Sequence, residues 1–217
     1  MDDTLYLERD YVWSGFRSVG EWARRRLGIS DLADVAWDAF VNGARGTIFN
    51  LALQRSGIDP TAELIEQLVD AYRGHRPDIE LCSDARDCLD SLRGTMPLAT
   101  VTDGPLVSQR AKAEALGLDR WIETMVFTAE LGPEFGKPHP RAFELVQERT
   151  GVPGSRCIYV ADNPAKDFDA PHALGWRTVR IRRPAALHSE VESNERVDLE
   201  VTDLGDVAEL TGIRQPR

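Results

Sequence analysis

Apolar residues in the first part of the chain recur with the period of an α-helix. Between about Glu8 and Arg93 they follow spacings such as i, i+4, i+7 or i, i+3, i+4. The clearest runs are Val12, Phe16, Val19 and Ala23, then Ile65, Leu68, Val69 and Tyr72. Ser30-Asp31 and Asp59-Pro60 have the chemistry of helix starts. This pattern predicts an all-helical bundle.

After Gly94, short apolar runs alternate with helical stretches. The runs that suit strands are Pro97 to Thr102, Thr124 to Phe127, Cys157 to Ala161 and Arg177 to Ile181. Helices are predicted over Leu106 to Leu116, Pro140 to Thr150, Ala165 to Leu174 and Asp206 to Leu210. We expect Val201 to add an edge strand and Pro184 to Arg196 to form a solvated loop. The alternation predicts an α/β fold with a doubly wound parallel sheet, because right-handed crossovers join such strands.

The charge balance narrows the classes of partner. With 26 Lys and Arg against 36 Asp and Glu, the 217 residues carry a formal net charge of −10. We expect no nucleic-acid or membrane partner, because binding to phosphates or anionic lipid needs a basic face. The three cysteines, Cys82, Cys88 and Cys157, lack the spacing of a metal site or a disulfide framework. These features predict a cytoplasmic protein and leave its oligomeric state open.

Polar residues just after the predicted strands are the candidates for chemistry, because ligands of a parallel sheet bind at the carboxyl ends of its strands. Thr102 and Asp103 end one strand, in a sequence that also suits a plain turn. Asp162 and Asp167 follow another strand and offer the oxygen ligands that Mg²⁺ prefers, although Asp162 also suits a helix N-cap. Lys137 lies in Gly-Lys-Pro, in a rigid loop that leads into a helix, where an isolated lysine would be a surface residue.

The order of these residues resembles that of the haloacid dehalogenase-like hydrolase superfamily, in its phosphatase-type members. Asp2-Asp3-Thr4-Leu5 is similar to the end of the family's first motif, Thr102 to the second, Lys137 to the third, and Asp162 to Asp167 to the fourth. The succession of four motifs runs through the chain, and the fourth is the most specific. Together they make a chance match improbable.

The resemblance implies a fold and a reaction. It implies a Rossmann-like core formed by residues 1–7 and 94–217, with residues 8–93 as an inserted helical cap and the helix that returns to the core. It also implies hydrolysis of a small phosphorylated metabolite, a phosphate monoester, through an aspartyl-phosphate, with Mg²⁺ as cofactor. The implied catalytic residues are Asp2, Thr102 and Lys137, the substrate contacts Thr102, Asp103 and Lys137, and the metal-site residues Asp2, Asp162 and Asp167.

One member of the family's set falls outside these 217 residues. The nucleophilic aspartate of the family lies two residues before the general acid, which is Asp2 here, and ends a strand expected between those that end at Thr102 and Ala161. We therefore expect the 217-residue chain by itself to be inactive. An alternative register, with Asp2 as the nucleophile, supplies no such strand.

Two functions from different classes stay open. The first is a Mg²⁺-dependent phosphatase, and the second is a relative that has lost hydrolysis and acts as a binding module. Retention of Asp2, Thr102, Lys137, Asp162 and Asp167 favours the phosphatase, because a binding module needs no general acid. Dehalogenation is a weaker third hypothesis.

Overall fold

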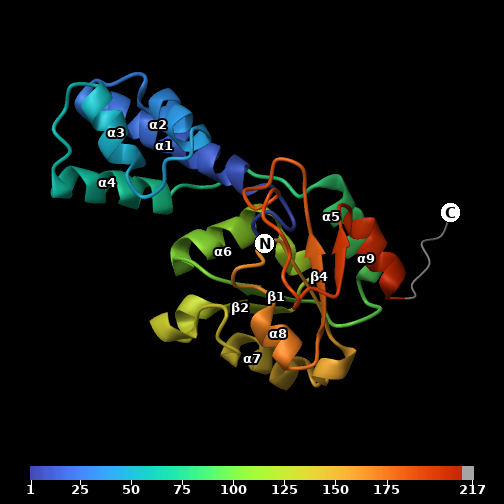
Figure 1. The fold of residues 1–217 in the computed structure, drawn as a ribbon. Helices are drawn as coiled ribbons and strands as arrows, with labels where there is room; N and C mark the ends of the chain where they lie inside the picture. The colour runs from blue at the N-terminus through green and yellow to red at the C-terminus, as the bar shows by residue number, and fades with distance from the viewer. Residues whose placement is uncertain (212–217) are drawn as a thin grey trace. The chain divides into compact units, whose positions relative to one another are not determined.

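The computed structural model describes residues 1–211, which divide into two units (Figure 1). The α/β unit comprises Met1–Glu8 and the chain from Glu80 onward, and the helical unit comprises Arg9–Ile79. Helix α5, Ser83–Leu92, therefore lies in the α/β unit. None of the helices in the described residues combines the length and apolarity needed to cross a membrane.

The helical unit has an aromatic core. Its helices are α1 (Glu8–Leu27), α2 (Leu32–Val41), α3 (Ile48–Arg55) and α4 (Ala62–Arg73). The ring centroid of Phe16 lies 6.2, 5.9 and 5.7 Å from those of Phe40, Phe49 and Tyr72. Helix α4 starts two residues later than expected, because the hydroxyl of Thr61 accepts a hydrogen bond from the Leu64 amide at 3.3 Å. The predicted helical bundle is confirmed over Arg9–Ile79, whereas the rest of the predicted range, up to Arg93, belongs to the α/β unit.

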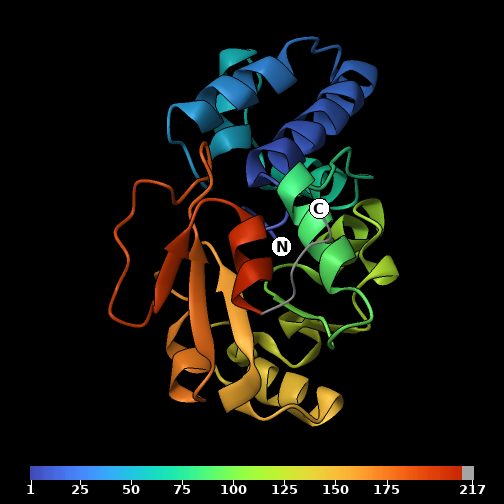
Figure 2. The ribbon, with the colours of Figure 1, turned by 90° about the vertical axis from the view of Figure 1, so that its right-hand side faces the viewer.

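The α/β unit alternates strands and helices as predicted. Its described strands are β1 (Ala99–Thr102), β2 (Thr124–Phe127), β3 (Ile158–Ala161), β4 (Arg177–Ile181) and β5 (Leu199–Val201). After α5 come the helices α6 (Leu106–Ala115), α7 (Arg141–Thr150), α8 (Asp169–Ala173) and α9 (Leu204–Leu210). Helices α5 and α9 pack side by side (Figure 2). The predicted α/β fold with parallel strands is confirmed.

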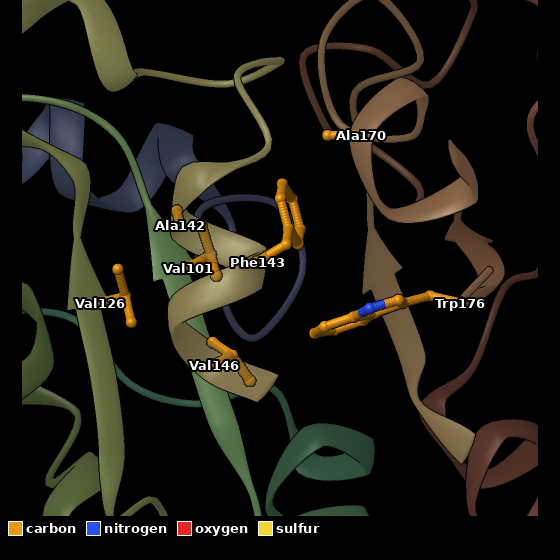
Figure 3. Packing of buried hydrophobic residues seen from close by; sticks show 7 residues of the cluster. All are labelled: Val101, Val126, Ala142, Phe143, Val146, Ala170 and Trp176. Carbon is orange, nitrogen blue, oxygen red and sulfur yellow. The ribbon is translucent and has the colours of Figure 1, made fainter. Parts of the chain in front are cut away.

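The described strands form two parallel sheets instead of one. Strand β1 pairs with β2, and the other sheet has the order β3-β4-β5. Figure 3 shows Val101 and Val126 on one side of the shared apolar cluster and Trp176 on the other, with Phe143 between them. The rings of Phe143 and Trp176 meet edge to face at 5.6 Å. Among residues 1–211, β1 and β3 therefore each keep one edge without a strand partner.

Helix α8 is shorter than the helix predicted over Ala165 to Leu174. A turn occupies the preceding residues, because the Asn163 amide donates to Oδ2 of Asp167 at 3.0 Å and the Ala165 amide donates to Oδ1 of Asn163 at 3.0 Å. Side chains that bind nearby backbone groups compete with helical hydrogen bonds. The turn keeps Asp167 outside the helix and close to the end of β3.

The segment from Pro184 to Arg196, here called the strap, is more than the solvated loop that the sequence predicted. Ala186 is buried, and the guanidinium of Arg180, itself fully buried, donates to the carbonyl of His188 and the hydroxyl of Ser193, both at 2.8 Å. The Asn194 amide donates to the carbonyl of Pro164 at 2.8 Å. The prediction is wrong in part, because polar anchors rather than apolar residues hold the strap on the protein.

Arg183 joins three parts of the α/β unit. Its Nε donates to the Thr4 carbonyl at 2.9 Å, and its NH1 pairs with Oδ1 of Asp84 at 2.9 Å, with side chains 6% and 13% exposed. Burial alone would raise the pKa of Asp84, but the hydrogen bonds from Arg183 and the Leu204 amide outweigh it and lower the pKa. The ion pair of Arg183 and Asp84 thus stabilises the fold, and both of its charged side chains are largely buried.

We expect Arg183→Met to lower the free energy of unfolding by about 3 kcal/mol at pH 7, since it leaves Asp84 as an unpaired buried charge. Because the folded pKa of Asp84 is depressed, the stabilisation is present above about pH 4 and is lost as the pH falls through the folded pKa. Urea unfolding at pH 7 and pH 3 measures both effects. Arg182→Met is the control, because Arg182 and Glu200 are 36% and 40% exposed and such pairs contribute about 1 kcal/mol or less. Equal losses in the two variants would contradict the prediction.

Candidate active site

The first residues of the chain make a tight turn around a buried carboxylate. Asp3 has a φ of 47°, a left-handed conformation that aspartate tolerates better than most residues. Its carboxylate accepts hydrogen bonds from the amides of Glu8 at 2.8 Å and Leu187 at 2.7 Å. Burial raises the pKa of Asp3 despite these bonds. Asp3 therefore fixes the turn and ties it to the strap.

Asp2 and Thr4, on either side of Asp3, have different partners. Oδ1 of Asp2 lies 2.8 Å from Nζ of Lys112 on α6, and it also accepts a hydrogen bond from the Tyr6 hydroxyl. Burial works to raise the pKa of Asp2, but the nearby ammonium of Lys112 outweighs it and the pKa is lowered. The hydroxyl of Thr4 donates to Oδ1 of Asp162 at 3.5 Å. The turn thus places one residue toward α6 and the other toward the end of β3.

The end of β1 places Thr102 and Asp103. The hydroxyl of Thr102, which is buried, donates to Oε1 of Gln109 on α6 at 2.9 Å. The Asp103 carboxylate accepts from the hydroxyl of Thr128 at 2.9 Å and from the Lys137 amide at 3.2 Å. The Asp103 side chain therefore anchors the loop that carries Lys137, and the substrate contact predicted for it stays a prediction.

Lys137 is a buried cation among oxygen atoms. Its side chain is 9% exposed, and its Nζ lies 2.7 Å from Oδ1 of Asp167, 4.0 Å from Oδ2 of Asp103 and 3.4 Å from the Tyr159 hydroxyl. Burial disfavours the ammonium, but Tyr159 and the two carboxylates outweigh it and raise the pKa of Lys137. The lysine is therefore charged at neutral pH and lies at the carboxyl ends of the strands.

Asp162 is the carboxylate that suits a cation best. Burial, together with the neighbouring charges of Asp167 and Asp3, raises its pKa to about 7. Its backbone carbonyl accepts from Nε of Arg180 at 3.1 Å, which fixes the residue at the end of β3. A carboxylate crowded by others in a partly buried place fits Mg²⁺, because a cation relieves the repulsion and prefers oxygen ligands.

The predicted metal-site residues Asp2, Asp162 and Asp167 do not form a cluster of ligands in the described structure. Within residues 1–211, no group of three or more His, Cys, Asp or Glu side chains is arranged to hold a metal ion. Asp2 pairs with Lys112, and Asp167 pairs with Lys137. Asp162 thus fits a direct ligand, whereas the roles of Asp2 and Asp167 at a metal stay predictions.

The structure also adds residues to the site that sequence reasoning did not select. These are Lys112, Gln109, Tyr159, Asp3 and His188, whose Nε2 lies 3.0 Å from Nδ2 of Asn163. The rarity of lysine in the sequence was one signal for Lys112, because the chain has only three lysines. In the structure all three pair with candidate carboxylates. The contacts of the others depend on tertiary packing and leave no mark in the spacing.

Three comparisons place the chain among known proteins. The family model for haloacid dehalogenase-like hydrolases matches residues 1–175. Glyceraldehyde 3-phosphate phosphatase of Methanopyrus kandleri is 33% identical over 156 residues, 70% of this chain and 66% of that protein. (S)-2-haloacid dehalogenase 2 of a Pseudomonas species is 26% identical over 128 residues, 58% of this chain and 54% of that protein. The matches thus span less than two thirds of each curated relative.

A solved structure supports the fold independently. The putative HAD-hydrolase YfnB of Bacillus subtilis, bound to magnesium, aligns with a TM-score of 0.70 at 19% identity, over 98% of this chain and 96% of that one. At this identity the likeness concerns the fold. The family model covers most of the chain and includes all four predicted motifs. The chain therefore belongs to the haloacid dehalogenase-like hydrolases.

Proposed function

We propose that this hydrolase is a Mg²⁺-dependent phosphatase that acts on a small phosphate monoester. The observation that carries the proposal is the buried ammonium of Lys137, held by Asp167 and Asp103 where the strands end. A fixed cation at this place suits a group on which negative charge gathers, as on a phosphoryl group in transfer. The M. kandleri relative, named as a phosphatase, supports the proposal, and so does the magnesium bound to YfnB.

Each residue has a defined part in the proposed reaction. Mg²⁺, held by Asp162, would neutralise charge on the phosphoryl group. Lys137 binds a phosphoryl oxygen, and Thr102 donates its hydroxyl to another once that hydroxyl turns away from Gln109. Asp2 in its protonated form gives a proton to the leaving oxygen, and the resulting carboxylate then takes one from the attacking water. Asp167 keeps Lys137 in place through their 2.7 Å contact.

The reaction needs one more carboxylate, which accepts the phosphoryl group. Asp2, Asp3, Asp103 and Asp167 are all held by cations or hydrogen-bond donors, and Asp162 is assigned to Mg²⁺. We propose that the nucleophile is an aspartate two residues before Asp2, at the end of a strand that lies between β1 and β3. On this proposal the 217-residue polypeptide alone does not turn over, and the strand-completed protein, which has such a strand and aspartate ahead of residue 1, does.

Phosphate chemistry is favoured over dehalogenation by the place of Asp2. An alkoxide leaves phosphorus poorly unless it is protonated, so a phosphatase needs a carboxyl group beside the leaving oxygen, whereas a halide leaves without a proton. The 26% identity to a haloacid dehalogenase makes this the second candidate. Release of phosphate from esters, compared with release of chloride from 2-chloropropionate, distinguishes the two.

The remaining proposals concern setting and partners. We propose a phosphorylated metabolite as the only partner that the reaction requires, and the cytoplasm as its place. No disulfide joins the cysteines of residues 1–211, which suits a reducing compartment.

Lys137→Met tests the role of the buried ammonium. In the strand-completed protein we expect kcat to fall by at least about 100-fold, since loss of one donor to a developing negative charge costs about 3 kcal/mol. Phosphate release from 4-nitrophenyl phosphate with Mg²⁺ measures the change. Lys166→Met is a matched control, because Lys166 is 42% exposed and lies 3.5 Å from Asp103, and we expect a loss below about fivefold. Near-normal turnover of the Lys137 variant would show that the buried ammonium serves the structure and not the reaction.

A further inference from the structure

The inward face of α6 is polar where a packed helix normally presents apolar side chains. Its buried residues are Ser108, Gln109, Lys112 and Ala113, and Lys112 is only 4% exposed. Lysine is among the residues least often buried, and burial of a polar group without a partner is costly. A cation kept in this position therefore points to a use beyond packing.

Gln109 and Lys112 each contact a residue of the proposed reaction. They are three positions apart, so their side chains lie on the same face of the helix. Gln109 holds the hydroxyl of Thr102 at 2.9 Å, and Lys112 holds the carboxylate of Asp2 at 2.8 Å. Asp2 and Lys112 are 110 residues apart in the sequence, so the contact belongs to the tertiary fold.

The two hydrogen bonds to Asp2 both end on the same oxygen. Lys112 and the Tyr6 hydroxyl donate to Oδ1. With Oδ1 held from two sides, rotation of the carboxylate is restricted and Oδ2 is the oxygen that can exchange a proton with a substrate. A side chain held in one orientation saves the entropy that a mobile acid would lose in the transition state.

We propose that Lys112 is a positioning residue that holds Oδ1 of Asp2 so that Oδ2 passes the proton to and from the reacting groups. This inference rests on the proposed phosphatase function. When the proposed aspartate nucleophile bonds to phosphorus, the bond between phosphorus and the bridging oxygen breaks, and its electron pair stays on that oxygen, which takes the proton from Oδ2 of protonated Asp2. When water then attacks phosphorus, the bond between phosphorus and the nucleophile breaks, phosphate leaves, and the proton of the water goes to Oδ2, so both carboxyl groups return to their first states. Lys112 keeps its own protons throughout.

The test separates positioning from folding by the choice of leaving group. In the strand-completed protein, Lys112→Met should lower kcat/KM on an alkyl phosphate by about 30-fold or more, since kcat/KM reports the step in which the leaving oxygen takes the proton and general acid catalysis contributes about 10²–10⁴. With 4-nitrophenyl phosphate, whose leaving group needs no proton, the loss in kcat/KM should stay below about threefold. Lys112→Arg should restore most of the activity on the alkyl phosphate. Equal losses on both esters would overturn the proposal.

A second measurement on the 217-residue protein needs no activity. The substitution Asp2→Asn is made in the parent and in Lys112→Met, and the shift of the urea midpoint is compared. If Lys112 holds Asp2, the shift should be at least twice as large in the parent, because the effects of substitutions at residues in contact are not additive. Equal shifts would show that the pair does not form in solution and would overturn the proposal. If the strand-completed protein hydrolyses no phosphate ester, the proposed function fails, whereas the urea cycle still decides whether Lys112 holds Asp2.

Discussion

The strand-completed protein is expected to hydrolyse 4-nitrophenyl phosphate with Mg²⁺, whereas residues 1–217 alone are expected to release phosphate no faster than buffer. The reason is chemical, because covalent catalysis needs a carboxylate that is free to attack, and the described carboxylates near Lys137 already hold other partners. Among residues 1–211, β1 and β3 each have an edge without a strand partner beside the cluster around Phe143, which suits a strand that carries the proposed nucleophile. Phosphate release with and without EDTA is the measurement.

A matched control separates the strand from its aspartate. The same added strand, ending in asparagine in place of aspartate, should raise the urea midpoint as much as the active version does, because a central strand of a parallel sheet is buried on both faces. It should nevertheless show no turnover. Phosphatase activity of residues 1–217 equal to that of the strand-completed protein would refute the assignment of the nucleophile. A strand-completed protein that folds and stays inactive would favour the binding module.

Asp162→Asn is expected to reduce the activity of the strand-completed protein below detection at any Mg²⁺ concentration. The variant replaces the charged oxygen that we assign to the metal with an amide oxygen, which binds Mg²⁺ weakly. Stability without Mg²⁺ should be unchanged or higher, since the substitution removes one of three crowded carboxylates, Asp3, Asp162 and Asp167. Phosphate release and thermal unfolding with and without Mg²⁺ measure the two effects.

Asp169→Asn is the control for this variant, because Asp169 is 56% exposed and lies 3.8 Å from Arg196 in an exposed pair. It should alter neither activity nor the effect of Mg²⁺ on the melting temperature. If Asp162→Asn kept the activity of its parent, Asp162 would be only a residue of the turn after β3, since α8 begins at Asp169 and Asp162 is therefore not its N-cap, and the metal would have to bind elsewhere.

The sequence was sufficient to find candidate site residues that lie at or directly after the end of a strand. Thr102 and Asp162 could be found because β1 and β3 are short apolar runs, and the ends of parallel strands meet at one edge. Lys137 could be found because it precedes a predicted helix in a distinctive short motif. These positions depend on local pattern, which a single sequence contains.

The rest of the site depends on contacts between distant segments. Lys112 sits inside a helix whose spacing shows nothing unusual, and its role appears only when α6 packs beside Asp2. The strap looked like a solvated loop because its residues are polar, yet polar anchors such as the Leu187 amide on Asp3 hold it at the site. Periodicity detects apolar burial, so it misses segments that are fixed by hydrogen bonds.

The gathering of all three lysines at one site has a practical consequence for labelling. Reagents that acylate lysine amines should react mainly with Lys166, whose side chain is 42% exposed. The side chains of Lys112 and Lys137 are only 4% and 9% exposed. The remaining 23 basic side chains are arginines, which such reagents leave intact. Attachment of a dye, a cross-linker or a solid support through lysine would therefore fall on the proposed active site first. The modification of Lys166 could accordingly serve as a probe of whether that centre is occupied.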